Sequence, residues 1–88
     1  MNIELTFYSD PSHGWGQIPH HLIDDLGIGS KISGYSYKDL DCAYLEEDCD
    51  LSLFMQSAEA KGWKITFKER NFNHDCAIRN YKRYTKGD

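Results

Sequence analysis

Valine is absent from this chain of 88 residues, and aliphatic side chains are scarce. Leu, Ile and Phe together number eighteen, about a fifth of the residues, a share close to that of disordered chains. Six Tyr, four Phe and two Trp offset this scarcity with large apolar surfaces, and the net charge of -4 is too small to keep the chain expanded. We therefore expect one folded domain over residues 1–88, because so short a chain rarely forms two separate cores.

Further absences limit the cellular context. The chain has no apolar run long enough to cross a bilayer, and its N-terminus lacks the basic and apolar regions of a signal peptide. Its three cysteines, Cys42, Cys49 and Cys76, are odd in number and show no Cys-x-x-Cys spacing, which argues against a disulfide framework. We expect a cytoplasmic protein with reduced thiols and without a cofactor.

Histidine and carboxylate side chains are frequent enough for a metal site, but their spacing is unsuitable. His20 and His21 are adjacent and would point about 100° apart on a helix, and no His pair has the i, i+4 spacing of a helical zinc site. Cys49 precedes a predicted helix, where a thiol pKa is often lowered, but the neighbouring acids would repel the thiolate. The sequence thus predicts neither a metal site nor a reactive cysteine.

Hydrophobic periodicity predicts the secondary structure. Alternation of apolar and polar side chains is typical of strands, whereas apolar residues spaced three or four apart are typical of helices. One Pro and two Gly interrupt the segment 9–16, which we expect to be a loop. The predicted strands cover 2–8, 32–37, 42–46 and 64–70, and the predicted helices cover 19–26 and 51–61.

The lengths of the connections then predict the fold class. A hairpin is expected over 38–41, and the short connections on both sides of helix 51–61 require the flanking strands to run parallel. We expect an α+β domain of two layers, in which a mixed four-stranded sheet carries both helices on one face and polar side chains on the other. The segment 71–88 shows little periodicity and is predicted to be irregular and basic.

Acidic and basic residues are unevenly distributed along the chain. Residues 1–60 hold eleven acids and two bases, a net charge of -9, whereas residues 61–88 hold eight bases and three acids, a net charge of +5. Two interpretations are open: a solvated face that the basic part neutralises in space, or an electronegative surface that attracts a basic partner. Asp48 and Asp50 are also expected to cap helix 51–61. Six carboxylates fall in one short stretch: Asp39, Asp41, Glu46, Glu47, Asp48 and Asp50.

The loop after the first predicted strand combines a carboxylate, a hydroxyl, an imidazole and an indole, from Asp10, Ser12, His13 and Trp15. One interpretation is a ligand-binding or proton-transfer site, because a carboxylate close to a histidine can set its tautomer. Asp10 and His13 are then the catalytic candidates, near Tyr44 or His74. The alternative is structural: Asp10 accepts hydrogen bonds from turn amides, His13 bonds a carbonyl, and Trp15 fills the core.

Bases alternate with aromatic side chains near the C-terminus. Such a segment is suited to stacking on nucleotides and to pairing with phosphates. In the alternative interpretation, aromatic residues spaced three apart pack a short turn, and the bases neutralise the acidic half of the chain. The residues are Arg79, Tyr81, Lys82, Arg83, Tyr84 and Lys86, and the candidates for nucleic-acid contact are Arg79, Lys82 and Arg83.

Four short segments read DPSHGW (10–15), YSY (35–37), YLEEDCD (44–50) and IRNYKRY (78–84). A chain with these segments in this order resembles a family of small, functionally uncharacterised proteins that bacteriophages, prophages and other mobile elements encode. The resemblance implies no specific activity, but small acidic proteins of phages often inhibit host defence systems or act as accessory regulators. The chain departs from the family pattern at Ser12, where Gly is usual, and at Cys76, where Ser is usual. The departure at Cys76 argues against a nucleophilic or metal-binding role for this cysteine.

These observations lead to three functional expectations. The first is a non-enzymatic accessory protein, of the anti-CRISPR or anti-restriction type, whose acidic stretch 39–50 docks on a basic surface of a host protein in the host cytoplasm. The second is a small enzyme or ligand-binding domain centred on the loop 10–15. The third is a nucleic-acid-binding regulator that uses the basic, aromatic C-terminal segment.

Overall fold

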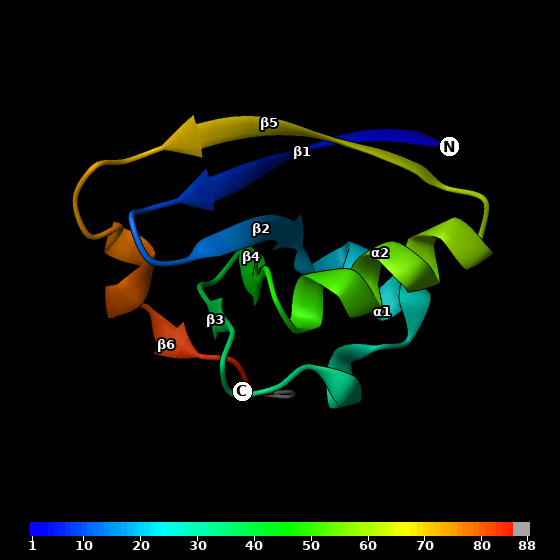
Figure 1. Cartoon of the computed structure of the whole chain (residues 1–88). Coiled ribbons are helices and arrows are strands. Elements are labelled where there is room, and N and C mark those ends of the chain that lie inside the picture. The colour runs from blue at the N-terminus through cyan, green and yellow to red at the C-terminus, as the bar shows by residue number, and fades with distance from the viewer. Residues whose placement is uncertain (86–88) are drawn as a thin grey trace.

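A mixed sheet of six strands is the framework of residues 1–85, the part of the chain that the computed structural model describes (Figure 1). The strands lie in the order β5-β1-β2-β4-β3-β6. No helix among the described residues is long and apolar enough to span a membrane. In chain order the elements are β1 (Asn2–Ser9), β2 (Gly14–Pro19), α1 (His20–Leu26), η1 (Gly29–Lys31), β3 (Tyr37–Lys38), β4 (Cys42–Glu46), α2 (Asp50–Ala60), β5 (Lys64–Asn71), η2 (Ala77–Asn80) and β6 (Lys82–Arg83), where η marks a 3-10 turn.

The strand directions follow the connections that the sequence predicts. β1 and β5 pair in parallel, whereas all other neighbouring strands pair antiparallel. β4 and β5 therefore point the same way on either side of α2, although β1 and β2 lie between them in the sheet. The α+β class, the two helices and the mixed sheet are confirmed. The number of four strands was too low, because β2 and β6 were not predicted.

Strand β2 occupies residues that the sequence assigns to a loop. Its glycines serve close packing: a Cβ atom on Gly14 would lie 2.4 Å from Cζ of Phe7, and one on Gly16 would lie 2.6 Å from Cδ1 of Leu51. Glycine in a strand often marks such a close approach, so it was a misleading sign of a loop here. The irregular segment is confined to residues 10–13, and Trp15 lies within the strand.

The predicted strand over 32–37 is mostly a loop, because only its last residue belongs to β3. The buried carboxylate of Asp50 holds this loop against the start of α2. It accepts hydrogen bonds from Ser33 N (3.1 Å), Ser33 Oγ (2.7 Å) and Ser36 Oγ (2.5 Å). Asp48 and Asp50 were wrongly predicted as helix caps, since Cys49 stands at the N-cap position and no side chain caps this helix end.

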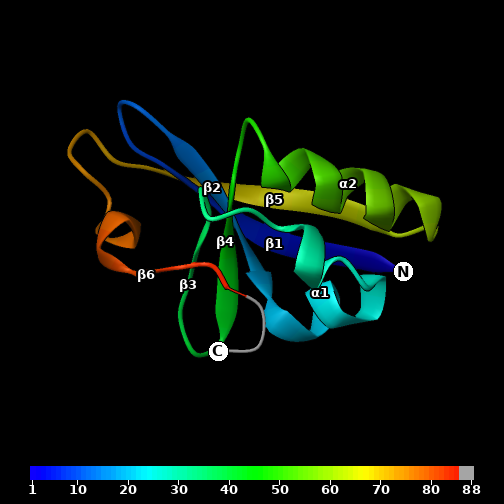
Figure 2. The same ribbon diagram turned by 90° about the horizontal axis from the view of Figure 1, so that it is seen from below.

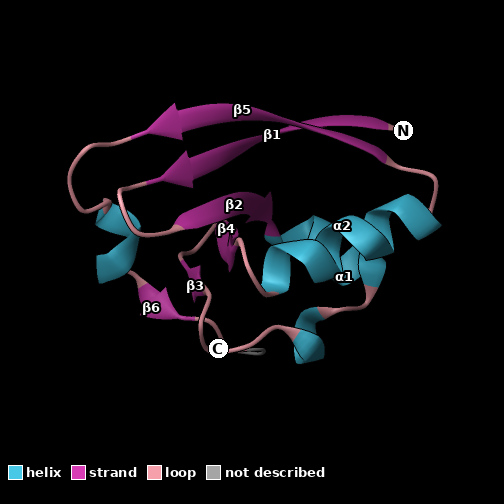
Figure 3. Ribbon diagram, in the orientation of Figure 1, coloured by secondary structure: helices cyan, strands magenta, loops and turns pink. Residues whose placement is uncertain are grey.

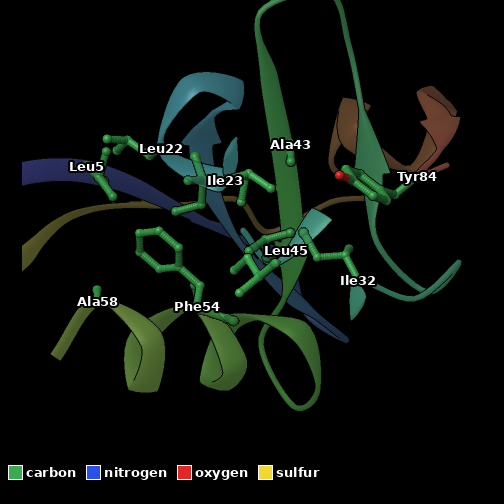
Figure 4. Close-up of a cluster of buried hydrophobic side chains, with 12 residues drawn as sticks. Leu5, Leu22, Ile23, Ile32, Ala43, Leu45, Phe54, Ala58 and Tyr84 are labelled. Carbon is green, nitrogen blue, oxygen red and sulfur yellow. The ribbon is translucent and has the colours of Figure 1, made fainter. Parts of the chain in front are cut away.

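The main core lies between the sheet and the two helices. Phe54 of α2 is fully buried and points toward Leu5 of β1 and Ile23 of α1 (Figure 4). The predicted helix ends are confirmed at Gly27 and Gly62, which have positive φ angles of 67° and 78°. These left-handed residues end α1 and α2, and the amide that follows each glycine donates back to the last turn.

The opposite face of the sheet carries a second buried cluster, which corrects the expectation of a polar face. Trp15 and Tyr44 alternate with the residues of the main core and are packed against Cys76 and Ile78. The segment after β5 thus contains buried residues and the elements η2 and β6, and only Lys86 among its named bases lies outside the described residues. η2 lies at the opposite end of the molecule from α1 and α2 (Figures 2 and 3).

Candidate functional site

The carboxylate of Asp10, directly after β1, is the anchor of the site. Its side chain is fully buried and accepts five hydrogen bonds. Oδ2 accepts from Arg79 Nε at 2.6 Å and Oδ1 from Arg79 Nη2 at 2.9 Å, which gives a bidentate ion pair. The remaining donors are the backbone amides of Ser12, His13 and Cys76. The Arg79 guanidinium, helped by these amides, holds the pKa of Asp10 far below its usual range.

Arg79 joins the loop to the two rings beside it. Its guanidinium carbon lies 5.5 Å from the centre of the Trp15 ring, and its Nη2 lies 3.1 Å from Nδ1 of His13. A guanidinium can only donate, so Nδ1 of His13 is the acceptor and the neutral imidazole carries its proton on Nε2. Arg79, and not Asp10 as the sequence suggested, is the charged side chain that hydrogen-bonds this imidazole. Ser12 is exposed, and its backbone amide is the group that bonds Asp10.

A cleft of about 450 Å³ opens beside this anchor, and we refer to it as the arginine cleft. Arg83 forms a second cationic wall: its guanidinium lies 4.9 Å from the centre of the Tyr37 ring and donates to the carbonyl of Gly34 at 2.9 Å. Within residues 1–85, Nη1 of Arg79 and the Nε and Nη2 atoms of Arg83 donate no hydrogen bond. The cleft is lined by His13, Trp15, Tyr35, Tyr37, Glu46, Cys49, Arg79 and Arg83.

Glu46, the last residue of β4, is the acidic residue of the arginine cleft. The residue is partly buried, yet its carboxylate forms no salt bridge with either arginine and no hydrogen bond to a described donor. The arginines are instead held by Asp10 and by Gly34 with Tyr37. The cleft therefore presents positive and negative groups that do not neutralise each other by direct contact.

All eight residues of the arginine cleft come from the four short segments DPSHGW (10–15), YSY (35–37), YLEEDCD (44–50) and IRNYKRY (78–84). These segments are far apart in the chain, and the pairing of the neighbouring strands β2, β4, β3 and β6 brings them together. Sequence reasoning singled out the loop and the bases separately and did not select Tyr35, Tyr37 or Cys49 as site residues. The two aromatic residues of the YSY segment could have pointed to Tyr35 and Tyr37, whereas Cys49 had no such signal.

The predicted acidic surface is divided in the structure. Asp39 and Asp41 lie in the β3–β4 turn, whereas Glu47 and Asp48 follow the other end of β4. These four residues are exposed and form no salt bridge with a described cation. The buried Asp50 is not part of any surface, which corrects its place among the binding residues.

The other candidates lie apart from the arginine cleft. Tyr44 and His74 line a second, smaller cleft, which His13 does not line, so they do not join His13 as the catalytic interpretation suggested. Lys82 is exposed on β6. Burial, with the charges of Asp39 and Asp41, raises the pKa of Cys42 to about 11. The charge of Asp50 raises the pKa of Cys49, in agreement with the predicted repulsion of its thiolate.

Residues 1–85 contain no group of three or more His, Cys, Asp or Glu side chains that could hold a metal ion. In comparisons with known proteins, no family model, no curated protein and no solved structure matches the chain. The site is therefore interpreted from its own geometry.

Proposed function

We propose that this chain is a non-enzymatic binding protein of a mobile element and that its arginine cleft takes up an anionic group of the ligand. The observation that carries the proposal is the prearranged pair of arginines in one cleft. The bidentate bond to the buried Asp10 orients Arg79, and Tyr37 and Gly34 orient Arg83. Arginines that are already oriented lose little entropy when they bind an anion.

The same contacts argue against catalysis by the loop. All five hydrogen bonds at Asp10 use its carboxylate as an acceptor, and the side chain is inaccessible, so it is unsuited to proton exchange with a substrate. His13 then lacks the acidic partner that the catalytic interpretation required. The loop is better explained as the rigid support of Arg79.

The proposal can be tested with inorganic phosphate as the probe, in an NMR titration of the side-chain N–H signals. We expect phosphate to shift the signals of Arg79 Nε–H and the Trp15 indole N–H, and we expect Arg83→Gln to reduce the affinity at least threefold. Lys68→Gln on the exposed side of β5 removes the same charge away from the cleft and serves as the control. Equal phosphate responses in the two variants would refute binding in the cleft.

A second candidate function is an inhibitory interaction with a host defence protein, of the anti-CRISPR or anti-restriction type. The supporting observation is that Asp39, Asp41, Glu47 and Asp48 are exposed without salt bridges to described cations, so the basic segment does not neutralise them by direct pairing. Carboxylates of this kind attract a basic surface, such as one that normally binds nucleic acid.

Affinity purification of the tagged chain from its host would identify such a partner. Asp39→Lys and Glu47→Lys should then slow the association, and rising salt should reduce the association rate of the wild type, because exposed charges are screened over about 8 Å at physiological ionic strength. Since the two residues lie at opposite ends of β4, the variant with the larger effect identifies the end that binds. Unchanged association rates in both variants would exclude the acidic docking surface.

A further inference from the structure

The arginine cleft combines groups that a simple anion would not use. Phosphate alone would engage the N–H groups of Arg79 and Arg83 that donate to no described acceptor, but it would gain nothing from the acidic Glu46, which is partly buried and lines the same cleft. A carboxylate accepts hydrogen bonds and repels anions. A ligand that satisfies the whole cleft must therefore carry an anionic group and, at some distance from it, one or more N–H donors.

The walls of the cleft favour a flat ring between these two ends. Tyr35, which lines the cleft, is 69 % exposed, so its ring is available for stacking. The ring of His13 lies nearly parallel to the buried Trp15, with an interplanar angle of 20°. Aromatic rings and guanidinium planes are the surfaces on which nucleic-acid bases stack. The cleft volume of about 450 Å³ also falls within the usual range for small-molecule sites.

We infer that the arginine cleft binds a nucleoside phosphate, whose phosphate group contacts Arg79 and Arg83. The base stacks on the rings of Tyr35 and His13, and an edge of the base donates its N–H groups to Glu46. Guanine suits this carboxylate best, because its N1–H and its amino group are adjacent donors that one carboxylate can accept together. Free mononucleotides and single-stranded nucleic acid present the same chemistry. The inference rests on the proposed anion-binding function and adds the class of ligand to it.

The experiment compares guanosine monophosphate with inosine monophosphate, adenosine monophosphate, inorganic phosphate and a short guanosine-containing single-stranded RNA by isothermal titration calorimetry and NMR. We expect guanosine monophosphate to bind at least tenfold more tightly than phosphate and more tightly than the inosine compound, which lacks the second donor. If the RNA binds tightly and the free nucleotide binds weakly, the result supports the same site, with single-stranded nucleic acid as its ligand in place of the free nucleotide.

Two variants test the contributions of Glu46 and Arg83 to binding separately. Glu46→Gln keeps the size of the side chain and should remove the preference for guanine over adenine, while raising the affinity for phosphate because a repelling negative charge is lost. Arg83→Gln should weaken phosphate and nucleotide alike, and Lys68→Gln should change neither. If phosphate binds in the cleft but no nucleotide binds more tightly, the ligand assignment fails and anion binding stands. If neither phosphate nor any nucleotide shifts the cleft signals, both proposals fail.

Discussion

Asp10 and Arg79, which are 69 residues apart in the chain, form a bidentate ion pair with N–O distances of 2.6 and 2.9 Å. The pair joins the loop after β1 to the 3-10 turn η2 and sets the orientation of a guanidinium that lies over Trp15. It therefore links the stability of the C-terminal segment to the shape of the arginine cleft.

Asp10→Asn should destabilise the fold by about 1–3 kcal/mol, because an NH2 group replaces one of the two buried oxygens that accept five hydrogen bonds, and Arg79 loses its charged partner. Asp75→Asn is the matched control, since Asp75 is 87 % exposed and lies 3.9 Å from the same guanidinium. Urea denaturation of the two variants measures the difference. Equal stabilities would show that the ion pair contributes nothing to the fold.

The same carboxylate predicts a dependence on pH. The pKa of Asp10 is lower in the folded than in the unfolded state, so its contribution is complete above the unfolded pKa and is lost as the pH falls toward the folded one. Between about pH 4 and pH 2, wild-type stability should fall more steeply than that of Asp10→Asn, because an Asp ionises near pH 3.9 when unfolded. If the stabilities of the two proteins changed in parallel over this pH range, the lowered pKa of Asp10 in the folded state would be contradicted.

Gly14→Ala should cost about 1–3 kcal/mol, because its Cβ would overlap the ring of Phe7 and the side chain or the strand must shift. Gly34→Ala is the control: no atom lies within 4 Å of the added Cβ, and its φ is not positive. Its stability should stay within about 0.5 kcal/mol of the wild type. Thermal or urea unfolding of both variants tests whether β2 packs as described.

Asp50→Ala should destabilise by about 2–4 kcal/mol, since the buried hydroxyl of Ser36 and both donors of Ser33 lose their acceptor. Loss of a helix cap would typically cost only about 1 kcal/mol. Asp48→Ala, two residues earlier and exposed, should be nearly neutral. A similar small loss in both variants would favour the capping role that the sequence suggested.

Phe54→Ala should leave a cavity that costs about 3–5 kcal/mol, a large part of the stability of a domain of this size. Phe54 is fully buried among residues of the sheet and of α1. Gln56→Ala on the exposed side of α2 is the control for helix propensity. Circular dichroism during urea unfolding distinguishes the two, and a stable Phe54→Ala protein would contradict this description of the core.

Local sequence determined the elements whose periodicity was undisturbed. The stripe with Phe54 and Ala58 located α2, alternation around Ile65 and Phe67 located β5, and Gly27 and Gly62 marked the helix ends. These features depend on neighbours within one turn or one strand, so the pattern itself contains the information. The parallel direction of β4 and β5 also followed, because a short crossover helix permits no other direction.

Only the tertiary structure decided which residues share a site and which glycines are strand residues. The sequence predicts that Gly14 and Gly16 lie in a loop. In the structure they are strand residues, and Phe7 and Leu51 occupy the space that a side chain at these positions would need. The sequence named Asp10, His13 and Arg79 but placed Arg79 in a separate nucleic-acid tail, because an ion pair across 69 residues has no local signature. Four motifs were visible in the sequence, and long-range pairing of β2, β4, β3 and β6 brought them to one cleft.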